Sequence, residues 1–102
     1  MKDHYYVYVM TDRTHSNFLV DTTTHLAHDV YEAKKRVVDH GVHHNDLHYL
    51  VHYEKVEDID SASQRERVIR EQLRHLIYEV INRNNPEWKD LSDEIDSFSE
   101  HQ

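Results

Sequence analysis

The sequence predicts a single small α/β (α+β) domain, with a three-stranded, mostly antiparallel sheet flanked by helices in the order β-β-α-β-α-(α). Three observations predict this class. Two short runs rich in aromatic and β-branched residues, at 5–10 and 17–20, come first along the chain. Two longer stretches with apolar residues at helical spacing follow, and an alternating run lies between them. The length of 102 residues suits one hydrophobic core and not two.

The first two runs are expected to pair as a hairpin, followed by a helix. The first run, Tyr-Tyr-Val-Tyr-Val-Met, is typical of a buried strand, and a polar turn at 11–16 separates it from the second. From Thr24 onward apolar residues recur at helical spacing, and Thr24 is placed to cap the helix. The apolar positions of this helix are Leu26, Val30, Ala33 and Val37.

A third strand is predicted at 47–54, where the residue types alternate. The alternation puts three residues on each face of the strand: Tyr49, Val51 and Tyr53 on one, and His48, Leu50 and His52 on the other. Between the first helix and this strand, residues 39–46 form a His-rich loop that contains Gly41.

The clearest helix follows residues 57–60. Ser61 and Gln64 have the spacing of a capping box at its start. A continuous apolar stripe runs along it, formed by Ala62, Ile69, Leu73, Leu76, Ile77 and Val80. Asn84-Asn85-Pro86 ends it, because the residue before a proline is pushed out of helical geometry. Residues 91–98 are expected to form a short final helix, so that the domain spans 4–98 and residues 99–102 are a frayed tail.

Composition and charge limit the classes of function. The chain has no cysteine, which excludes disulfides and thiolate metal sites. No apolar run approaches the length of a membrane-spanning helix, and the start of the chain lacks the apolar region of a signal peptide, so a cytoplasmic protein without a membrane partner is expected. The formal net charge of −8 argues against tight binding to DNA or RNA, because neutralising phosphates supplies most of that affinity.

The order of elements and several short motifs together resemble the GIY-YIG endonuclease superfamily, specifically its small single-domain bacterial members. The similarity runs from about Tyr5 to Leu91 with almost no gaps. Tyr6-Val7-Tyr8 stands at the family's first signature, and Leu19-Val20-Asp21 follows at the second after ten intervening residues. Further segments fall in register: the helix from Thr23 to Ala33, Tyr53-Glu54, Arg65-Glu66-Arg67 and Asn85-Pro86-Glu87-Trp88.

The resemblance implies a site for phosphodiester hydrolysis. In the family, tyrosines from both signatures and an arginine on the first helix surround the scissile phosphate, and a glutamate on the second long helix holds one divalent metal. Tyr8 matches the first signature tyrosine, with Tyr6 close beside it, and Glu66 matches the metal ligand, which would hold Mg²⁺ or Mn²⁺. Three asparagines match a late polar position of the site: Asn85, which fits best, and Asn82 or Asn84 as alternatives.

The same comparison shows substitutions where the family's chemistry lies. Leu19 replaces the tyrosine of the second signature, and Asp21 replaces its glycine, which normally permits close approach of the backbone. Asp29 occupies the position of the arginine, and Ala33 replaces a histidine common four residues later. An aspartate there puts an anion beside the phosphate, which costs several kcal/mol at an effective dielectric of about 20. The resemblance therefore implies a degenerate active site.

Three functions follow from these residues. The first is a protein of nuclease fold that is inactive or severely impaired, with a remaining role in binding nucleic acid or protein. The second is an active metal-dependent endonuclease whose site is rebuilt from Tyr6, Tyr8, His28, Glu66 and the late asparagines. The third is an acidic module that binds a basic protein partner. The sequence names no such partner and does not indicate the oligomeric state.

Two further groups of residues are expected to be ordinary surface. The chain has eleven histidines, and His40, His43, His44 and His48 raise the question of a transition-metal site. Because Gly41 places them in a loop, we expect solvent-exposed side chains instead. The basic clusters are expected to be solvated surface charge: Lys34-Lys35-Arg36, and Arg65, Arg67, Arg70 and Arg74.

Overall fold

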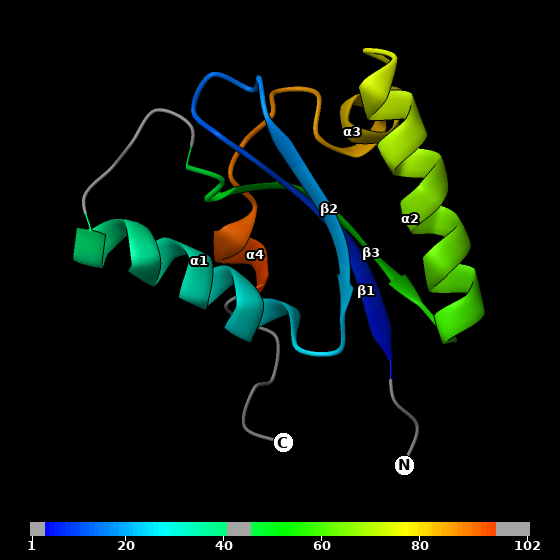
Figure 1. Cartoon of the computed structure of the whole chain (residues 1–102), viewed down its shortest axis with the longest axis horizontal. Coiled ribbons are helices and arrows are strands. Elements are labelled where there is room, and N and C mark those ends of the chain that lie inside the picture. Colours follow the sequence, from blue (N-terminus) through cyan, green and yellow to red (C-terminus); the bar gives the residue numbers. More distant parts are fainter. Residues whose placement is uncertain (1–3, 41–45, 96–102) are drawn as a thin grey trace.

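The computed structural model describes residues 4–40 and 46–95, in which a three-stranded antiparallel sheet separates two layers of helices (Figure 1). Strands β1 (Tyr5–Thr11), β2 (Phe18–Thr23) and β3 (Tyr49–Val56) lie in the order β2-β1-β3. The central strand β1 pairs antiparallel with both neighbours. The predicted α+β class, the hairpin and the third strand are confirmed.

Each face of the sheet is covered by two helices (Figure 1). Helices α2 (Ile59–Arg74) and α3 (Glu79–Asn84) cover one face, and α1 (Leu26–His40) and α4 (Ser92–Ile95) cover the other. The core under α2 and α3 consists of Val7, Val9, Val20, Val51, Ala62, Ile69, Leu73 and Ile81. The core under α1 and α4 consists of Tyr8, Met10, Leu26, Val30, Ala33, Leu50 and Ile95.

The predicted alternation along the third strand is wrong. Val9 pairs with His52 but Met10 pairs with Leu50, so Val51 is an extra residue in β3 and forms a β-bulge. A bulge shifts the faces of all residues on one side of it. Val51 therefore packs under α2, whereas Tyr53 packs with the core under α1.

The long predicted helix begins earlier than expected and is broken in the middle. Its N-cap is Asp58, whose carboxylate accepts a hydrogen bond from the backbone N–H of Ser61, so the predicted capping box of Ser61 and Gln64 is wrong. The helix ends at Arg74, because Leu76 has a left-handed backbone with φ of 62°. The N–H of Leu76 donates to the carbonyl of Leu73, which is one of the two hydrogen bonds of a Schellman ending.

The break also removes part of the predicted apolar stripe. Leu76 is 73% exposed and Ile77 is 45% exposed, so neither belongs to the core. Thr24 does not cap α1 as expected: its hydroxyl lies 2.9 Å from Nδ1 of His25, and Thr23 accepts the hydrogen bond from the backbone N–H of His25. The expected helix at 91–98 is present as α4, and its last residues and the tail at 99–102 lie outside the described residues. Among the helices in the described part of the chain, none is long and apolar enough to cross a membrane.

Candidate functional site

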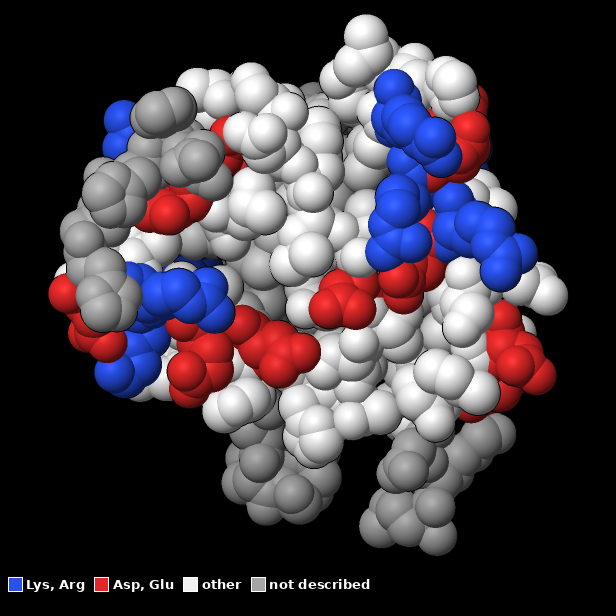
Figure 2. Space-filling model, in the orientation of Figure 1, with Lys and Arg blue, Asp and Glu red and all other residues white. Residues whose placement is uncertain are grey.

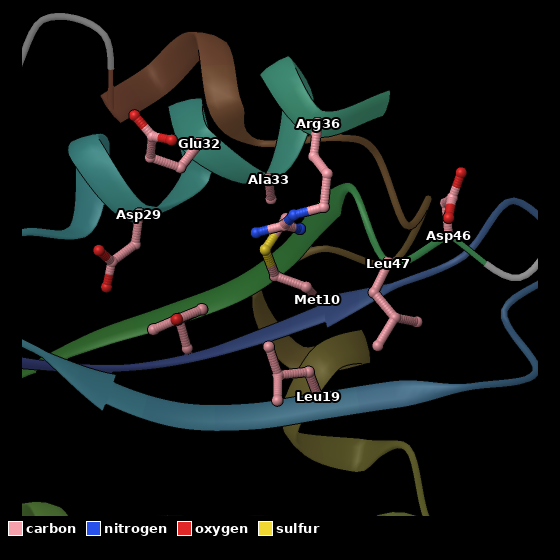
Figure 3. Close-up of a pocket in the computed structure, with 9 residues that line it drawn as sticks. Met10, Leu19, Asp29, Glu32, Ala33, Arg36, Asp46 and Leu47 are labelled. Carbon is pink, nitrogen blue, oxygen red and sulfur yellow. The ribbon is translucent and has the colours of Figure 1, made fainter. Parts of the chain in front are cut away.

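A pocket of about 430 Å³ lies between α1 and the strands, and it brings together positions that the family resemblance assigns to catalysis (Figure 3). Tyr8, Leu19 and Asp29 line it, and so does Ala33. The remaining lining residues are Met10, Glu32, Arg36, Asp46 and Leu47. The first-signature tyrosine and the replacements of the second tyrosine, the arginine and the histidine therefore share one cavity.

Local geometry explains why these residues meet. Tyr8 stands opposite Asp21 in the β1–β2 ladder, and Met10 stands opposite Leu19, so each pair points to the same face of the sheet. Above them, Asp29 and Ala33 are one helical turn apart on α1 and share a side of the helix. Met10 contributes to the core under α1 and is 2% exposed.

Tyr8 is the most deeply buried polar side chain of the pocket. The residue is 5% exposed, and its hydroxyl has no hydrogen-bond partner within residues 4–40 and 46–95. Burial and the nearby carboxylates of Asp29, Asp21 and Glu66, with burial the largest cause, together raise the pKa of the Tyr8 phenol to about 12. The hydroxyl therefore stays protonated at neutral pH.

Glu66 is not a lining residue of the pocket. From α2 it accepts hydrogen bonds from the Thr22 hydroxyl at 2.7 Å and from the Arg70 guanidinium at 2.5 Å. Arg70 also donates to the carbonyl of Val20 at 2.9 Å, which fixes α2 to the edge strand. Burial alone would raise the pKa of Glu66, but the bonds from Arg70 and Thr22 outweigh it and hold the pKa below its usual value. Both carboxylate oxygens are thus already engaged.

The proposed metal position has no supporting ligand cluster. Within the part of the chain that the structure describes, no three His, Asp or Glu side chains are placed to hold a metal ion. Of the histidines considered as metal ligands and expected to be solvent-exposed, His43 and His44 lie outside the described residues. His48 is half-buried, and its ring lies 4.5 Å from that of Tyr49 between centroids.

Tyr6 and Asn85 lie outside the pocket. Tyr6 packs edge-to-face on Tyr53, with ring centroids 6.4 Å apart. Asn85 is 3% exposed, and its amide donates to the carbonyls of Val51 at 3.1 Å and Lys89 at 2.9 Å. Its oxygen accepts from the backbone N–H of Lys89 at 3.0 Å. The structure therefore gives Asn85 the role of closing the turn after α3.

The alternative candidates Asn82, Asn84 and His28 lie at the surface, and they too are outside the pocket lining. Asn82 accepts a hydrogen bond from the indole of Trp88, and Asn84 is exposed. His28 is exposed and does not line the pocket. His28 therefore does not share the pocket with Tyr8 and Asp29.

Sequence reasoning missed Arg36, which lines the same pocket as Asp29 (Figure 3). Its side chain extends from α1 toward the strands. No carboxylate in the described ranges lies within ion-pair distance of it. The signal was available: Arg36 follows Asp29 by seven residues and Ala33 by three, which places all three on one side of a helix.

The surface charges gather over the two long helices. In Figure 2, charged residues gather over α1 and over α2, with a largely uncharged strip between them. The basic side chains of α2 are mostly paired: Arg65 with Glu54, Arg70 with Glu66, and Arg74 with Glu71. They do not form a free basic surface, and the pocket itself contains three carboxylates against one guanidinium.

The arrangement was compared with family models, with curated proteins and with solved structures, and none of them matches this chain. Membership of the GIY-YIG superfamily therefore stays a prediction from the sequence motifs. Chemically, the pocket offers a neutral phenol, two carboxylates on α1 and a guanidinium above an apolar floor. These groups can hold a ligand by hydrogen bonds and charge.

Proposed function

We propose that the chain is a degenerate member of the GIY-YIG nuclease superfamily, which binds a ligand in the pocket under α1 and does not hydrolyse phosphodiesters at a useful rate. The observation that carries the proposal is the pairing of Tyr8 with Asp29 in one pocket. In an active site of this family, the second of these positions holds a cation. Here it holds an anion, and a phosphate entering the pocket would meet carboxylates.

The protonation state of Tyr8 supports the loss of catalysis. A general base works best when its pKa lies near the working pH. The pKa of the Tyr8 phenol is raised to about 12, first by burial and then by Asp29, Asp21 and Glu66. At pH 7 the ionised form is present at roughly one part in 10⁵, so this phenol is a poor proton acceptor.

The surroundings of Glu66 support it as well. A metal ion at Glu66 would have to displace or share the hydrogen bonds from Thr22 and Arg70. It would also lie close to the Arg70 guanidinium, which repels a cation. Removing one preorganised charged donor from a hydrolytic site typically costs about a hundredfold to a thousandfold in rate. The combined replacements at Leu19, Asp21 and Asp29 exceed that loss.

A cleavage assay tests the proposal. Supercoiled DNA, single-stranded DNA and RNA would be incubated with the protein in Mg²⁺ and in Mn²⁺, at pH 6 and pH 8. We expect no cleavage above that of a Glu66→Ala variant purified in the same way. Metal-dependent cleavage that disappears in Glu66→Ala and persists in the matched surface variant Glu87→Ala would contradict the proposal.

Arg36 favours a second candidate, an active phosphodiesterase with a displaced phosphate contact. Its guanidinium lines the pocket without an ion-pair partner in the described residues. In this case the parent protein would cleave, and Arg36→Ala and Glu66→Ala would each abolish cleavage. A variant with Leu19→Tyr, Asp21→Gly and Asp29→Arg separates the two candidates: a gain of cleavage only in that variant supports the degenerate site.

A further inference from the structure

The charges of the pocket under α1 favour a positively charged ligand. Three lining side chains are carboxylates, those of Asp29, Glu32 and Asp46, and Arg36 supplies one guanidinium. The pocket is thus net negative, in a chain whose formal net charge is −8. Both the local and the overall field attract cations and repel anions.

The floor of the pocket is apolar, which indicates that the cation is organic. Met10, Leu19 and Leu47 line it, Ala33 adds an apolar contact from α1, and Leu19 is 39% exposed although it is a large apolar side chain. A hydrated metal ion gains nothing from such a floor, whereas methylene groups are removed from water on it. The described residues also lack a cluster of ligands for a metal ion.

The Tyr8 hydroxyl supplies a second acceptor beside the carboxylates. It lies in the pocket lining, more than nine-tenths of the residue is buried, and no residue in the described part of the chain is hydrogen-bonded to it. Its oxygen can accept a hydrogen bond from an N–H donor. Asp29 lines the same pocket, and its charge acts on this phenol. A polar atom that faces a pocket and has no partner among the described residues is a place where a ligand can form a hydrogen bond.

We propose that the pocket binds an alkyl chain that ends in a primary ammonium group. The ammonium lies between the Asp29 carboxylate and the Tyr8 oxygen, and the methylene groups lie over Met10 and Leu19. This assignment rests on the proposed function, because it requires a pocket that binds and does not cleave. The volume of about 430 Å³ is within the range of roughly 300 to 1,000 Å³ that is usual for small-ligand sites.

The ammonium group has two sources, a free alkylamine or the lysine side chain of a partner protein. Arg36 separates them. It lies seven residues from Asp29 on α1, or roughly 10 Å along the helix axis, so the two side chains enter the pocket from different turns of the helix. A lysine in a peptide has a backbone carbonyl at the opposite end from its ammonium group, and this oxygen can accept a hydrogen bond from Arg36. A simple alkylamine has no such group.

NMR titration of the ¹⁵N-labelled chain at low ionic strength tests the proposal, with 1-aminopentane as the probe and 1-pentanol as its uncharged match. We expect saturable shifts of the Tyr8, Asp29 and Ala33 amides with the amine and none with the alcohol. Asp29→Asn should weaken amine binding about tenfold, because a charge-assisted hydrogen bond is lost. Tyr8→Phe keeps the ring and should weaken it several-fold. Glu87→Gln, an exposed carboxylate outside the pocket lining, should leave it unchanged.

The same titration with Nα-acetyl-lysine methylamide identifies the source. Tighter binding of this compound than of 1-aminopentane, lost in Arg36→Ala, assigns the site to a partner's lysine, whereas tighter binding of the simple amine assigns it to free alkylamines. Equal binding of amine and alcohol, no effect of Asp29→Asn, or no binding at all would overturn the proposal. If the amine does not bind and the protein does not cleave nucleic acid, the inactive nuclease fold still stands and only the amine site is overturned. Cleavage that depends on Glu66 would overturn the proposed function itself.

Discussion

Two groups of polar residues, one on each face of the sheet, differ in how completely they are paired. Under α2, Glu54 accepts two hydrogen bonds from Arg65, at 2.7 and 3.0 Å, and lies 2.7 Å from Nε2 of the buried His52. Under α1, the Tyr8 hydroxyl and the Asp29 carboxylate form no hydrogen bond or ion pair with a side chain in the described residues. Glu54 and its partners under α2 are thus closed onto one another, whereas Tyr8 and Asp29 are open to a ligand.

This contrast separates groups that stabilise the fold from groups available to a ligand. An unpaired buried polar group costs stability, so a folded chain keeps few of them without a reason. On the α2 side the exception is Oε1 of Gln72, a buried atom without a partner in the described residues. We have no physical account of that atom. In the pocket, the unpaired groups lie together on one cavity, which is the distribution expected of a binding site.

The largest expected effect is on the closed side, at Asn85. Asn85→Ala removes three hydrogen bonds to the backbone of Val51 and Lys89, of which the one to the carbonyl of Val51 is buried. We expect the free energy of unfolding to fall by about 3 kcal/mol, measured by urea denaturation. Asn84→Ala, at the exposed neighbouring position, should change it by less than about 0.5 kcal/mol. Similar effects of the two variants would mean that Asn85 does not close the turn.

Glu54→Gln tests the charge network under α2. The hydrogen bonds from His52 and Arg65 lower the pKa of Glu54 from 4.5 to about 2, although burial acts in the opposite direction. Because an ionised carboxylate only accepts hydrogen bonds, Nε2 of His52 carries the proton in this contact. We expect the variant to lose about 2 kcal/mol of stability at pH 7, since Arg65 and His52 keep only a neutral partner.

The sign of its pH dependence follows from the lowered pKa. Above pH 4.5 the carboxylate is ionised in both states, and the network contributes its full stability. As the pH falls from 4.5 toward 2, the unfolded chain takes up the proton first and this contribution is lost. The free energy of unfolding of the parent, measured with urea, should therefore fall more over that window than that of Glu54→Gln. Equal slopes would show that the network does not hold the Glu54 charge. Glu71→Gln, at an exposed pair on the same helix, should behave as the parent does.

The sequence predicts the elements of this fold better than their internal irregularities. Aromatic and β-branched runs placed the first two strands, alternation placed the third, and apolar spacing placed α1 and α2, because these patterns report burial on a regular backbone. The alternation along β3 failed at Val51, since one extra residue reverses the faces and leaves the composition unchanged. The prediction of one continuous helix failed for a similar reason. The residue with left-handed backbone that ends a helix is usually glycine, and here it is Leu76.

The pocket was predictable only in part. The family resemblance placed Tyr8, Leu19 and Asp29 near one another, and the structure places them in one cavity. It did not indicate that the second oxygen of Glu66 is used by Arg70, because that contact depends on the side-chain rotamers of α2. Arg36 was recoverable from its helical spacing to Asp29, but as one of three consecutive basic residues it looked like ordinary surface charge.

A smaller effect is expected at the break between α2 and α3. Leu76 is 73% exposed and has φ of 62°, so its side chain contributes little packing and its backbone is strained. Leu76→Gly should raise the free energy of unfolding by about 0.5 to 1 kcal/mol, because glycine adopts this conformation without a Cβ clash. Leu76→Ala keeps the Cβ and should give no such gain. A loss of stability in Leu76→Gly would show that the exposed leucine stabilises the end of α2.

The smallest expected effect on stability is at Asp29, and it is the most direct test of the open side. Asp29 lies in the first turn of α1, where a negative charge interacts favourably with the helix dipole, and it has no ion-pair partner in the described residues. Asp29→Asn should therefore lower the free energy of unfolding by no more than about 0.5 kcal/mol. Binding of 1-aminopentane should still fall about tenfold. A loss above about 1.5 kcal/mol, as at Glu54, would place Asp29 among the groups that hold the fold. Stability and binding would then change together, and the contrast between the two faces would no longer hold.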